Sequence, residues 1–328
     1  DGQQVSITVI PVLKTMDKID ADGAPVLDWK GQRERAEVGV IFSGFLIVRL
    51  LVQEYERHGD IDIMGFYRRR IRRLLPALVA VLAFVAVYGA LFAEGGQRRR
   101  IGGDILATLG YVMNWRLIAQ GDEYFGDQGA ASPLQHAWTL AIEEQFYLVV
   151  PLLVIALFAL AGRRRRWVVV AALVVGCFAS LLWTWHLGFP EQADHGRVYY
   201  GTDTHAFGLL TGAVASLLMT STQSNPQADS WAAAGKAESR IAGVIGTLAL
   251  IGYGAQLFLM PDDAEFTYRG GLFLTSVLGV LMVWGVVREY GPMTPLFRTK
   301  VMRWFGQRSF SLYLWHWPVI MMLKALFE

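Results

Sequence analysis

Long apolar runs separated by short polar clusters occupy most of the chain. One membrane-crossing helix needs roughly 20 predominantly apolar residues, and several runs approach that length. The clearest runs are Leu74–Ala93, Leu140–Ala161, Trp167–Leu187, Ile241–Met260, Gly271–Val287 and Ser309–Phe327. A soluble core could explain one such run but not this series, so the pattern predicts an all-α fold, a polytopic transmembrane helical bundle.

Four further segments are shorter or interrupted. They are Val38–Val52, Ala206–Met219, an incomplete Val5–Leu13, and Ile105–Ile118, which contains Asn114 and Arg116. Basic loops of membrane proteins favour the cytoplasm. We place Arg68–Arg73 in the cytoplasm. If Ile105–Ile118 re-enters the membrane without crossing it, the later basic loops also face the cytoplasm, and Arg98–Arg100 is the one exception. These loops are Arg163–Arg166, Lys236–Arg240 and Arg288–Arg308. We therefore predict about nine crossings and one re-entrant segment, and irregular backbone at that depth implies a central cavity.

Composition supports a membrane protein and excludes little else. Of 328 residues, 54% are hydrophobic and 18% are charged, against about a quarter charged in soluble domains. The net charge of +2 is too small to indicate nucleic-acid binding, and the single Cys177 precludes a disulfide within the chain. We expect one domain over residues 1–328, trimmed at both ends, with Thr220–Ser239 as a polar loop.

The first candidate motif is an arginine cluster at the start of an apolar run, Phe66 to Pro76. Arg69 and Arg73 are four residues apart and would share a helix face. Arginine suits phosphate recognition, so this cluster, with Arg70, could hold the phosphates of a nucleotide carrier such as coenzyme A. The alternative is an orientation signal that binds anionic lipid headgroups.

The second motif runs from Ser132 to Tyr147 and places His136, Glu143 and Glu144 at the entry of an apolar helix. Ionisable groups inside a membrane are costly and are functional candidates by default. His136 and Glu143 are seven residues apart, two turns on one face, and a histidine with a carboxylate can act as a general base on a hydroxyl. The alternative is a structural polar network between helices.

Two more polar motifs border apolar runs. Arg197–His205 contains Tyr199 and Asp203, which could hydrogen-bond a sugar-like acceptor, although Asp203 could instead cap a helix. Ser309–Pro318 contains His316, where a proline within the helix would free a carbonyl and produce a kink. An interfacial aromatic belt with a kink is the alternative. The histidines show no metal-ligand spacing, so no metal is expected.

Together these motifs resemble the integral-membrane acyltransferase family 3. The resemblance rests on Ser43–Ile47, the F-x-x-R-R-x-x-R-L-x-P pattern at 66–76, Asn114-Trp115, H-x-W-T-L-x-x-E-E-Q-F-Y at 136–147, Y-Y-G-T-D-T at 199–204 and Y-L-W-H-W-P at 313–318. It is similar in detail to the branch often fused to an extracytoplasmic SGNH-type domain, which acylates peptidoglycan or surface polysaccharide. Such a domain, or a partner, would lie outside this chain.

The resemblance implies transfer of an acyl group, often acetyl, from cytoplasmic acyl-CoA to a carbohydrate hydroxyl outside a cell membrane. Its implied donor-binding residues are Arg69, Arg70 and Arg73. His136 and Glu143, preferred to Glu144, would be catalytic, and the acceptor side would include Tyr199, Asp203 and His316.

Two departures qualify this expectation. The family opens with Asp-Gly-x-Arg and places a histidine, its presumed base, eleven residues later, whereas this chain has Gln4 and Thr15 at the aligned positions. His205 also stands where arginine is usual.

Three explanations for these departures compete: loss of catalysis in a paralogue or engineered form, misassignment of the first forty residues, or another base such as His136. Rival functions are a non-catalytic binding subunit and a transporter or flippase of a lipid-linked sugar.

Overall fold

The computed structural model describes residues 18–19, 25–26, 32–121, 132–161, 165–187, 195–219, 236–259, 266, 270–288 and 290–327. Apart from the short strand pair β1 (Lys18–Ile19) and β2 (Pro25–Val26), the regular elements of this part are helical. The helices are α1 (Gln32–His58), α2 (Ile63–Phe92), α3 (Gly95–Leu109), α4 (Met113–Gln120), the 3₁₀ helix η1 (Gln135–Ala137), α5 (Trp138–Ala161), α6 (Arg165–His186), α7 (His195–Tyr200), α8 (Thr202–Met219), α9 (Lys236–Leu259), α10 (Leu272–Val287), α11 (Met293–Phe297) and α12 (Lys300–Phe327). The predicted all-α bundle is confirmed.

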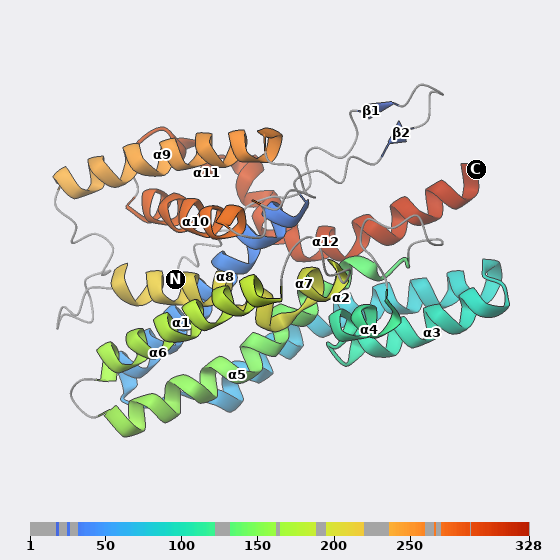
Figure 1. The fold of residues 1–328 in the computed structure, drawn as a ribbon, viewed down its shortest axis with the longest axis horizontal. Helices are drawn as coiled ribbons and strands as arrows, with labels where there is room; N and C mark the ends of the chain where they lie inside the picture. The colour runs from blue at the N-terminus through green and yellow to red at the C-terminus, as the bar shows by residue number, and fades with distance from the viewer. Residues whose placement is uncertain are drawn as a thin grey trace.

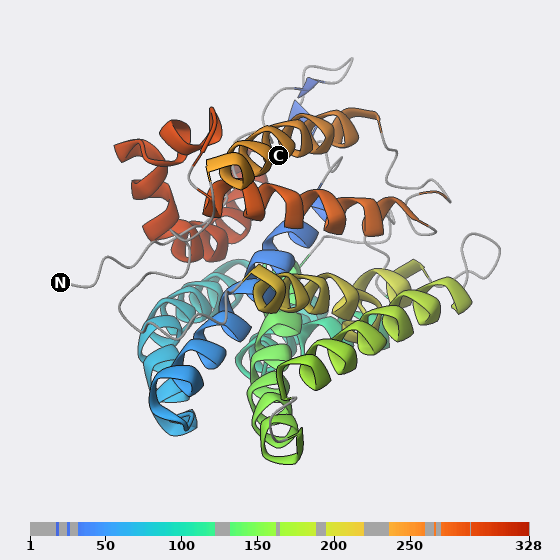
Figure 2. The same cartoon turned by 90° about the vertical axis from the view of Figure 1, so that its left-hand side faces the viewer.

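The helices form two connected groups (Figure 1). The helix α1 packs against α8, α10 and α5, while α9 pairs with α10 and α6 pairs with α8. The α2–α3 hairpin and the C-terminal part of α12 extend away from this group. Seen from the side in Figure 2, α1 runs between α9–α10 and the α5–α6 side of the molecule.

Four described helical segments are long and apolar enough to cross a membrane: Ile63–Phe92, Gln135–Leu160, Arg166–His186 and Ala237–Leu259. The apolar α10 is shorter. The chain is thus a helical membrane protein, while the number of crossings stays a prediction.

Two predicted boundaries are wrong. Part of the expected basic loop Arg288–Arg308 is helical, since it contains α11 and the first turns of α12. The reason is local: Thr299 accepts a hydrogen bond from the backbone N–H of Met302 at 3.2 Å and so caps α12 before its apolar part begins. The expected polar loop Thr220–Ser239 is likewise shortened by α9, which begins at Lys236. The proposed span Val5–Leu13 lies outside the described residues.

The segment Ile105–Ile118, predicted to re-enter, is divided into the end of α3 and the start of α4. The break includes Tyr111, whose φ of 54° is rare for a residue other than glycine. Its carbonyl accepts a hydrogen bond of 2.7 Å from the side chain of Gln145 in α5. Protein groups therefore satisfy the interrupted backbone, as burial in a membrane would require.

The helices α1 and α2 show why similar apolar runs occupy different surroundings. In α1 most of the side chains from Val40 to Val52 are buried against other helices, and Leu50 is the exposed exception. In α2 the buried residues recur every three or four positions, and the opposite face exposes apolar side chains such as Val87 and Leu91. The second pattern is typical of a helix with one protein-facing and one lipid-facing side.

Close packing of α1 on α8 depends on two glycines. A Cβ on Gly44 would lie 1.9 Å from the Leu209 carbonyl oxygen, and one on Gly212 would lie 2.0 Å from the Ile41 carbonyl oxygen. Small residues allow such backbone approach between membrane helices.

We expect Gly44→Ala to destabilise the protein by about 1–3 kcal/mol because the added methyl forces the two backbones apart. Gly39→Ala in the same helix is the matched control, because a Cβ there meets nothing within 4 Å. That control should be neutral or gain up to about 1 kcal/mol from helix propensity. Unfolding temperatures in detergent would check this, and equal shifts for both variants would contradict it.

Candidate functional site

The start of α5 is the meeting point of the polar motifs. Its residues contact the arginine cluster of α2, the aromatic motif of α12, and the junctions of α3–α4 and α7–α8. These segments are far apart in sequence, so the fold brings together what the sequence presents as separate motifs.

Arg70 is the arginine of the cluster that faces inward. Its guanidinium lies 2.6 Å from a Glu144 carboxylate oxygen and 3.6 Å from the centroid of the Tyr147 ring. The side chains of Arg70 and Glu144 are 23% and 14% exposed. A charge-assisted hydrogen bond plus a cation–π contact in partly buried surroundings fixes both groups.

Arg69 and Arg73 are exposed on the surface of α2. Among the described residues Arg69 pairs with Glu54, at a long distance of 3.8 Å, and its side chain is 57% exposed. Their spacing of four residues puts both guanidinium groups on one helix face. The predicted trio therefore divides into one inward arginine and two that are accessible to a ligand.

Glu143 lies one turn from Tyr147 on α5 and is half-buried. The Tyr147 hydroxyl donates to its carboxylate at 3.4 Å, and the Ser43 side chain of α1 is a further partner. Glu143 and Glu144 thus belong to one carboxylate pair, in which Arg70 binds Glu144 directly.

His136 lies in η1, directly before α5, and is buried at 9% exposure. Its ring packs edge-on against Tyr313 and His316 of α12, with ring centroids 5.3 Å away in both cases. The Tyr313 hydroxyl donates to the His136 carbonyl. Neither ring nitrogen of His136 has a hydrogen-bond partner of standard geometry among the described residues, which is unusual for a buried imidazole.

The proline in α12 adds a polar backbone group to the helix face that contacts His136. Pro318 has no N–H to donate to the Leu314 carbonyl four residues earlier. His316 bonds through Nδ1 to the Tyr313 carbonyl at 2.5 Å. The α12 face next to His136 therefore carries an imidazole, a phenol and a freed carbonyl.

His136 and Glu143 do not form a hydrogen-bonded pair in this structure. Seven residues at roughly 1.5 Å each separate them by about 10 Å along the helix. The same-face spacing predicts their alignment, but Glu143 does not orient the imidazole by direct contact.

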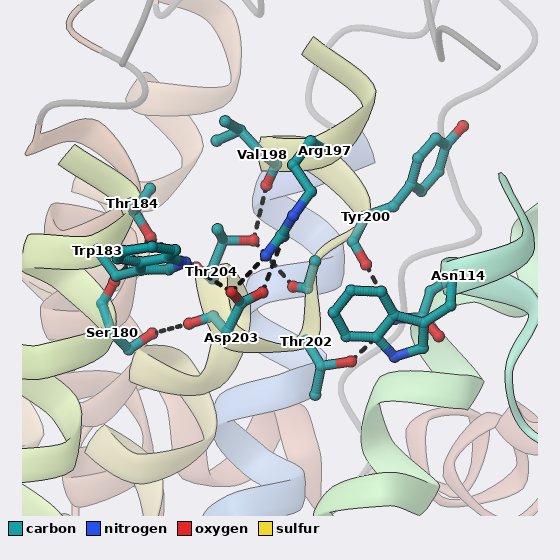
Figure 3. A network of polar contacts seen from close by, with 12 residues as sticks. Asn114, Ser180, Trp183, Thr184, Arg197, Val198, Tyr200, Thr202, Asp203 and Thr204 are labelled. Carbon is teal, nitrogen blue, oxygen red and sulfur yellow. Dashed lines mark hydrogen bonds and ion pairs between the residues drawn. The ribbon is translucent and has the colours of Figure 1, made fainter. Parts of the chain in front are cut away.

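The junction of α7 and α8 carries a second polar group (Figure 3). Arg197 holds Asp203 through two bonds, Nη1 to Oδ1 at 2.9 Å and Nη2 to Oδ2 at 2.5 Å. The Trp183 indole N–H also donates to Asp203 Oδ2 at 2.6 Å. Asp203 lies in the first turn of α8, and its side chain remains 38% exposed at the rim.

Burial raises the pKa of Asp203, but the hydrogen bonds and charge of Arg197, with the Trp183 bond, outweigh it and hold this pKa below its ordinary value. The folded state therefore favours the carboxylate. Its stabilising contribution is complete above the unfolded pKa of about 4 and is lost as pH falls through the lower folded pKa.

Arg197→Met should flatten the acid side of the stability profile, because without the arginine burial raises the folded pKa of Asp203 toward its unfolded value and less stability is lost as pH falls. Unfolding temperatures measured from about pH 3 to pH 7 would show this. In an Asp203→Asn background the same substitution should not flatten the profile, and a flattening there would assign the effect to another group.

Two other predicted residues are buried nearby. Tyr199 is 2% exposed and packs with Trp138 and Tyr200, so it does not face an acceptor in this structure. His205, where the family resemblance suggests arginine, bonds through Nε2 to the Tyr199 carbonyl at 2.6 Å.

Sequence reasoning missed Gln145 as the connector of these regions. Its Nε2 donates to the Tyr111 carbonyl at 2.7 Å and to Asn114 Oδ1 at 3.0 Å. Its Oε1 accepts from Thr202 at 2.6 Å and from the Trp115 indole at 3.3 Å. All four bonding positions of the amide are filled. Its place beside the Glu pair is the one sequence signal that could have indicated it.

No group of three or more metal-ligating side chains occurs in the part of the chain that the structure describes. Gln4 and Thr15, the positions that depart from the expected first motif, lie outside that part.

Comparison with known proteins identifies the scaffold. Residues 40–328 match the family Acyl_transf_3, described as an acyltransferase domain. The chain is 33% identical over 304 residues to the peptidoglycan O-acetyltransferase OatA of Listeria monocytogenes, covering 91% of this chain and 46% of that protein. It is 32% identical over 289 residues to YrhL of Bacillus subtilis, provisionally named a peptidoglycan O-acetyltransferase, covering 87% of this chain and 44% of YrhL.

The chain thus spans less than half the length of these relatives. No solved structure matches it significantly. The family match covers every motif at the start of α5 and its partners on α2, α8 and α12, and it begins after Gln4 and Thr15. The chain therefore belongs to the Acyl_transf_3 family and is an acyltransferase domain of the peptidoglycan O-acetyltransferase-like branch.

Proposed function

We propose that this domain, as a multi-pass protein of the cell membrane, transfers an acetyl group from cytoplasmic acetyl-CoA to a hydroxyl of an extracytoplasmic cell-wall glycan. The observation that supports this most is the line of polar groups on α5. It leads from the Arg70–Glu144 pair through Glu143 to the buried imidazole of His136, in η1 directly before α5. Polar groups in an otherwise apolar membrane helix are costly and indicate a reaction path.

We place the donor, acetyl-CoA, beside α2, where the arginine cluster meets the Arg70–Glu144 pair. Arg69 and Arg73 offer two exposed guanidinium groups on one face, which suits the phosphates of coenzyme A. Glu144 and His136 are eight residues apart, about 12 Å along α5. The acyl arm of the donor would lie along this face, with its thioester near His136.

His136 is the proposed general base. Its free ring nitrogen accepts the proton of the attacking hydroxyl while that oxygen forms a C–O bond to the thioester carbonyl carbon. The C–S bond then breaks, and the proton passes to the departing thiolate, giving an ester and coenzyme A. The Tyr313 and His316 rings pack edge-on against the imidazole, and the Tyr313 hydroxyl bonds the His136 backbone carbonyl.

The acceptor would approach the rim at Asp203. The carboxylate is partly exposed while Arg197 fixes its position, and the Trp183 ring beside it is 43% exposed. A fixed carboxylate can accept hydrogen bonds from sugar hydroxyls.

The test is transfer of radiolabel from acetyl-CoA to cell-wall glycan by the protein in liposomes. We expect the Arg69→Ala/Arg73→Ala variant to raise KM for acetyl-CoA, whereas Arg303→Ala, another exposed arginine on α12, should not. Unchanged donor affinity in the double variant would contradict the assignment of the arginines.

The Gln4→Arg/Thr15→His variant should be measured in parallel. Turnover by the unmodified chain would make the first-helix histidine dispensable and favour His136. Turnover by the variant alone would identify an inactivated acyltransferase, and coenzyme A binding without turnover in both would favour a binding subunit.

A further inference from the structure

A second buried charged group bonds Ser132, four residues before His136, and has no role in the steps above. Asp104 of α3 is fully buried. One carboxylate oxygen accepts from Arg116 Nε at 2.6 Å, and the other accepts from the Ser132 hydroxyl at 2.6 Å. Burial of a charged pair requires that its remaining bonding positions be filled, and Ser132 fills one of them.

Arg116 reaches Asp104 because the surface of α3 is open at Gly103. A Cβ at that position would lie 2.2 Å from the Arg116 guanidinium. The same guanidinium donates to the Arg100 carbonyl at 3.3 Å. The arginine of α4 is thereby held flat along α3, and its charge is directed at Asp104.

Ser132 has nearly all its polar groups engaged. Its hydroxyl donates to Asp104 and accepts from the Leu134 backbone N–H at 3.2 Å. Its carbonyl accepts from the Gln135 N–H at 3.0 Å and from the Trp317 indole of α12 at 2.9 Å. This residue therefore connects α3, α12 and the turn that leads into η1.

The turn fixed in this way carries His136 four residues later. α12 contacts both ends of it, because Trp317 bonds the Ser132 carbonyl and the Tyr313 hydroxyl bonds the His136 carbonyl. The imidazole has no hydrogen bond of standard geometry among the described residues, although it interacts with the backbone of Leu314 in α12. Its position therefore depends largely on the backbone and on packing against α12.

We propose that Asp104, acting through the Ser132 hydroxyl and oriented by Arg116, is a positioning residue that holds the His136 backbone against α12. The inference rests on the proposed function in one respect, since His136 is taken as the base. Asp104 touches neither substrate nor reacting atoms. A displacement of about 1 Å at a catalytic group can lower the rate by about 100-fold, so loss of this link should act on kcat.

The experiment compares Ser132→Ala, Asp104→Asn and the double variant in full-length chain. Ser132→Ala removes the link but leaves the Asp104–Arg116 pair, so it limits the danger of misfolding. We expect kcat to fall about 10- to 100-fold in each single variant with KM for acetyl-CoA unchanged. The double variant should lose no more than the worse single one, because both substitutions break the same link.

A second readout does not need turnover. Modification of His136 by diethylpyrocarbonate, followed by mass spectrometry, should be several-fold faster in both single variants because the ring is less tightly packed. The matched control is Glu238→Gln, which breaks the 2.6 Å ion pair with Arg288 away from α5 and should change neither readout.

The two hypotheses fail separately. Absence of turnover in the unmodified protein would refute the proposed function, while the modification rates would still decide the positioning role. Normal kcat and an unchanged His136 modification rate in Ser132→Ala would overturn the positioning role. Equal slowing by Glu238→Gln would also overturn it, because the effect would then be one of general stability.

Discussion

Replacing His136 by glutamine is expected to lower kcat for acetyl transfer by about 100- to 10,000-fold, the usual contribution of a general base. Glutamine preserves size and polarity but cannot accept and return a proton near neutral pH. The ring contacts with Tyr313 and His316 would be partly retained, so the fold should survive. Single-turnover measurements with labelled acetyl-CoA would check this, with donor binding measured on the same sample.

The matched control for this substitution is His58→Gln. His58 is exposed at the end of α1, where its Nδ1 lies 3.2 Å from the Glu54 carbonyl oxygen. Its substitution should leave kcat unchanged. If His136→Gln retains normal turnover, the imidazole is not the base.

Much of the fold could be predicted from the sequence because apolar length directly reports membrane helices. The run Trp167–Leu187 corresponds closely to α6, and the run Leu74–Ala93 ends within one residue of the end of α2, although α2 begins earlier, at Ile63. Helix boundaries were harder where polar residues continue a helix beyond its apolar part. α12 begins nine residues before the predicted run because Thr299 caps it and nothing breaks the helix until the membrane-like segment starts.

The candidate site was predictable as a set of motifs but not as an arrangement. The sequence indicated His136, Glu143 and Arg70, yet Arg70 bonds Glu144, and His136 faces α12. Contacts between segments separated by 74 to 177 positions depend on the packing of whole helices. Helical periodicity alone describes only neighbours on one helix.

The residues that sequence reasoning missed share one property. Asp104 and Gln145 are ordinary polar residues in their local sequence. The importance of both comes from partners on other segments of the chain, and Asp104 is also fully buried. Tyr199 shows the reverse case, because its polar neighbours suggested an acceptor contact, whereas the fold turns its ring into the core. Local patterns report residue type well and orientation poorly when several helices surround a segment.

Replacing Arg70 by methionine is expected to lower the free energy of unfolding, the second large effect. Arg70→Met would leave the Glu144 carboxylate partly buried without its 2.6 Å partner and would remove the cation over the Tyr147 ring. Breaking a fully buried pair costs about 3–5 kcal/mol. Because the two side chains keep 23% and 14% exposure, we expect a smaller loss of about 2–3 kcal/mol.

A double-variant cycle would separate this pair from general damage. Adding Glu144→Gln to Arg70→Met removes the unpaired charge, so part of the lost stability should return. Arg69→Met is the matched control on the neighbouring position, since its ion pair of 3.8 Å is exposed and should contribute about 0–1 kcal/mol. Unfolding in mixed detergent micelles would be measured for the unmodified protein, Arg70→Met, Glu144→Gln, the double variant and Arg69→Met.

The same variants also distinguish the roles of the two arginines in transfer. Arg69→Met should raise KM for acetyl-CoA with kcat nearly unchanged, because it removes donor binding alone. Arg70→Met should lower kcat with a smaller effect on KM, because Arg70 is bound to Glu144 and holds the carboxylate pair beside the reaction path. An identical rise in KM for both would mean that Arg70 leaves Glu144 to bind the donor, and that the pair opens when acetyl-CoA arrives.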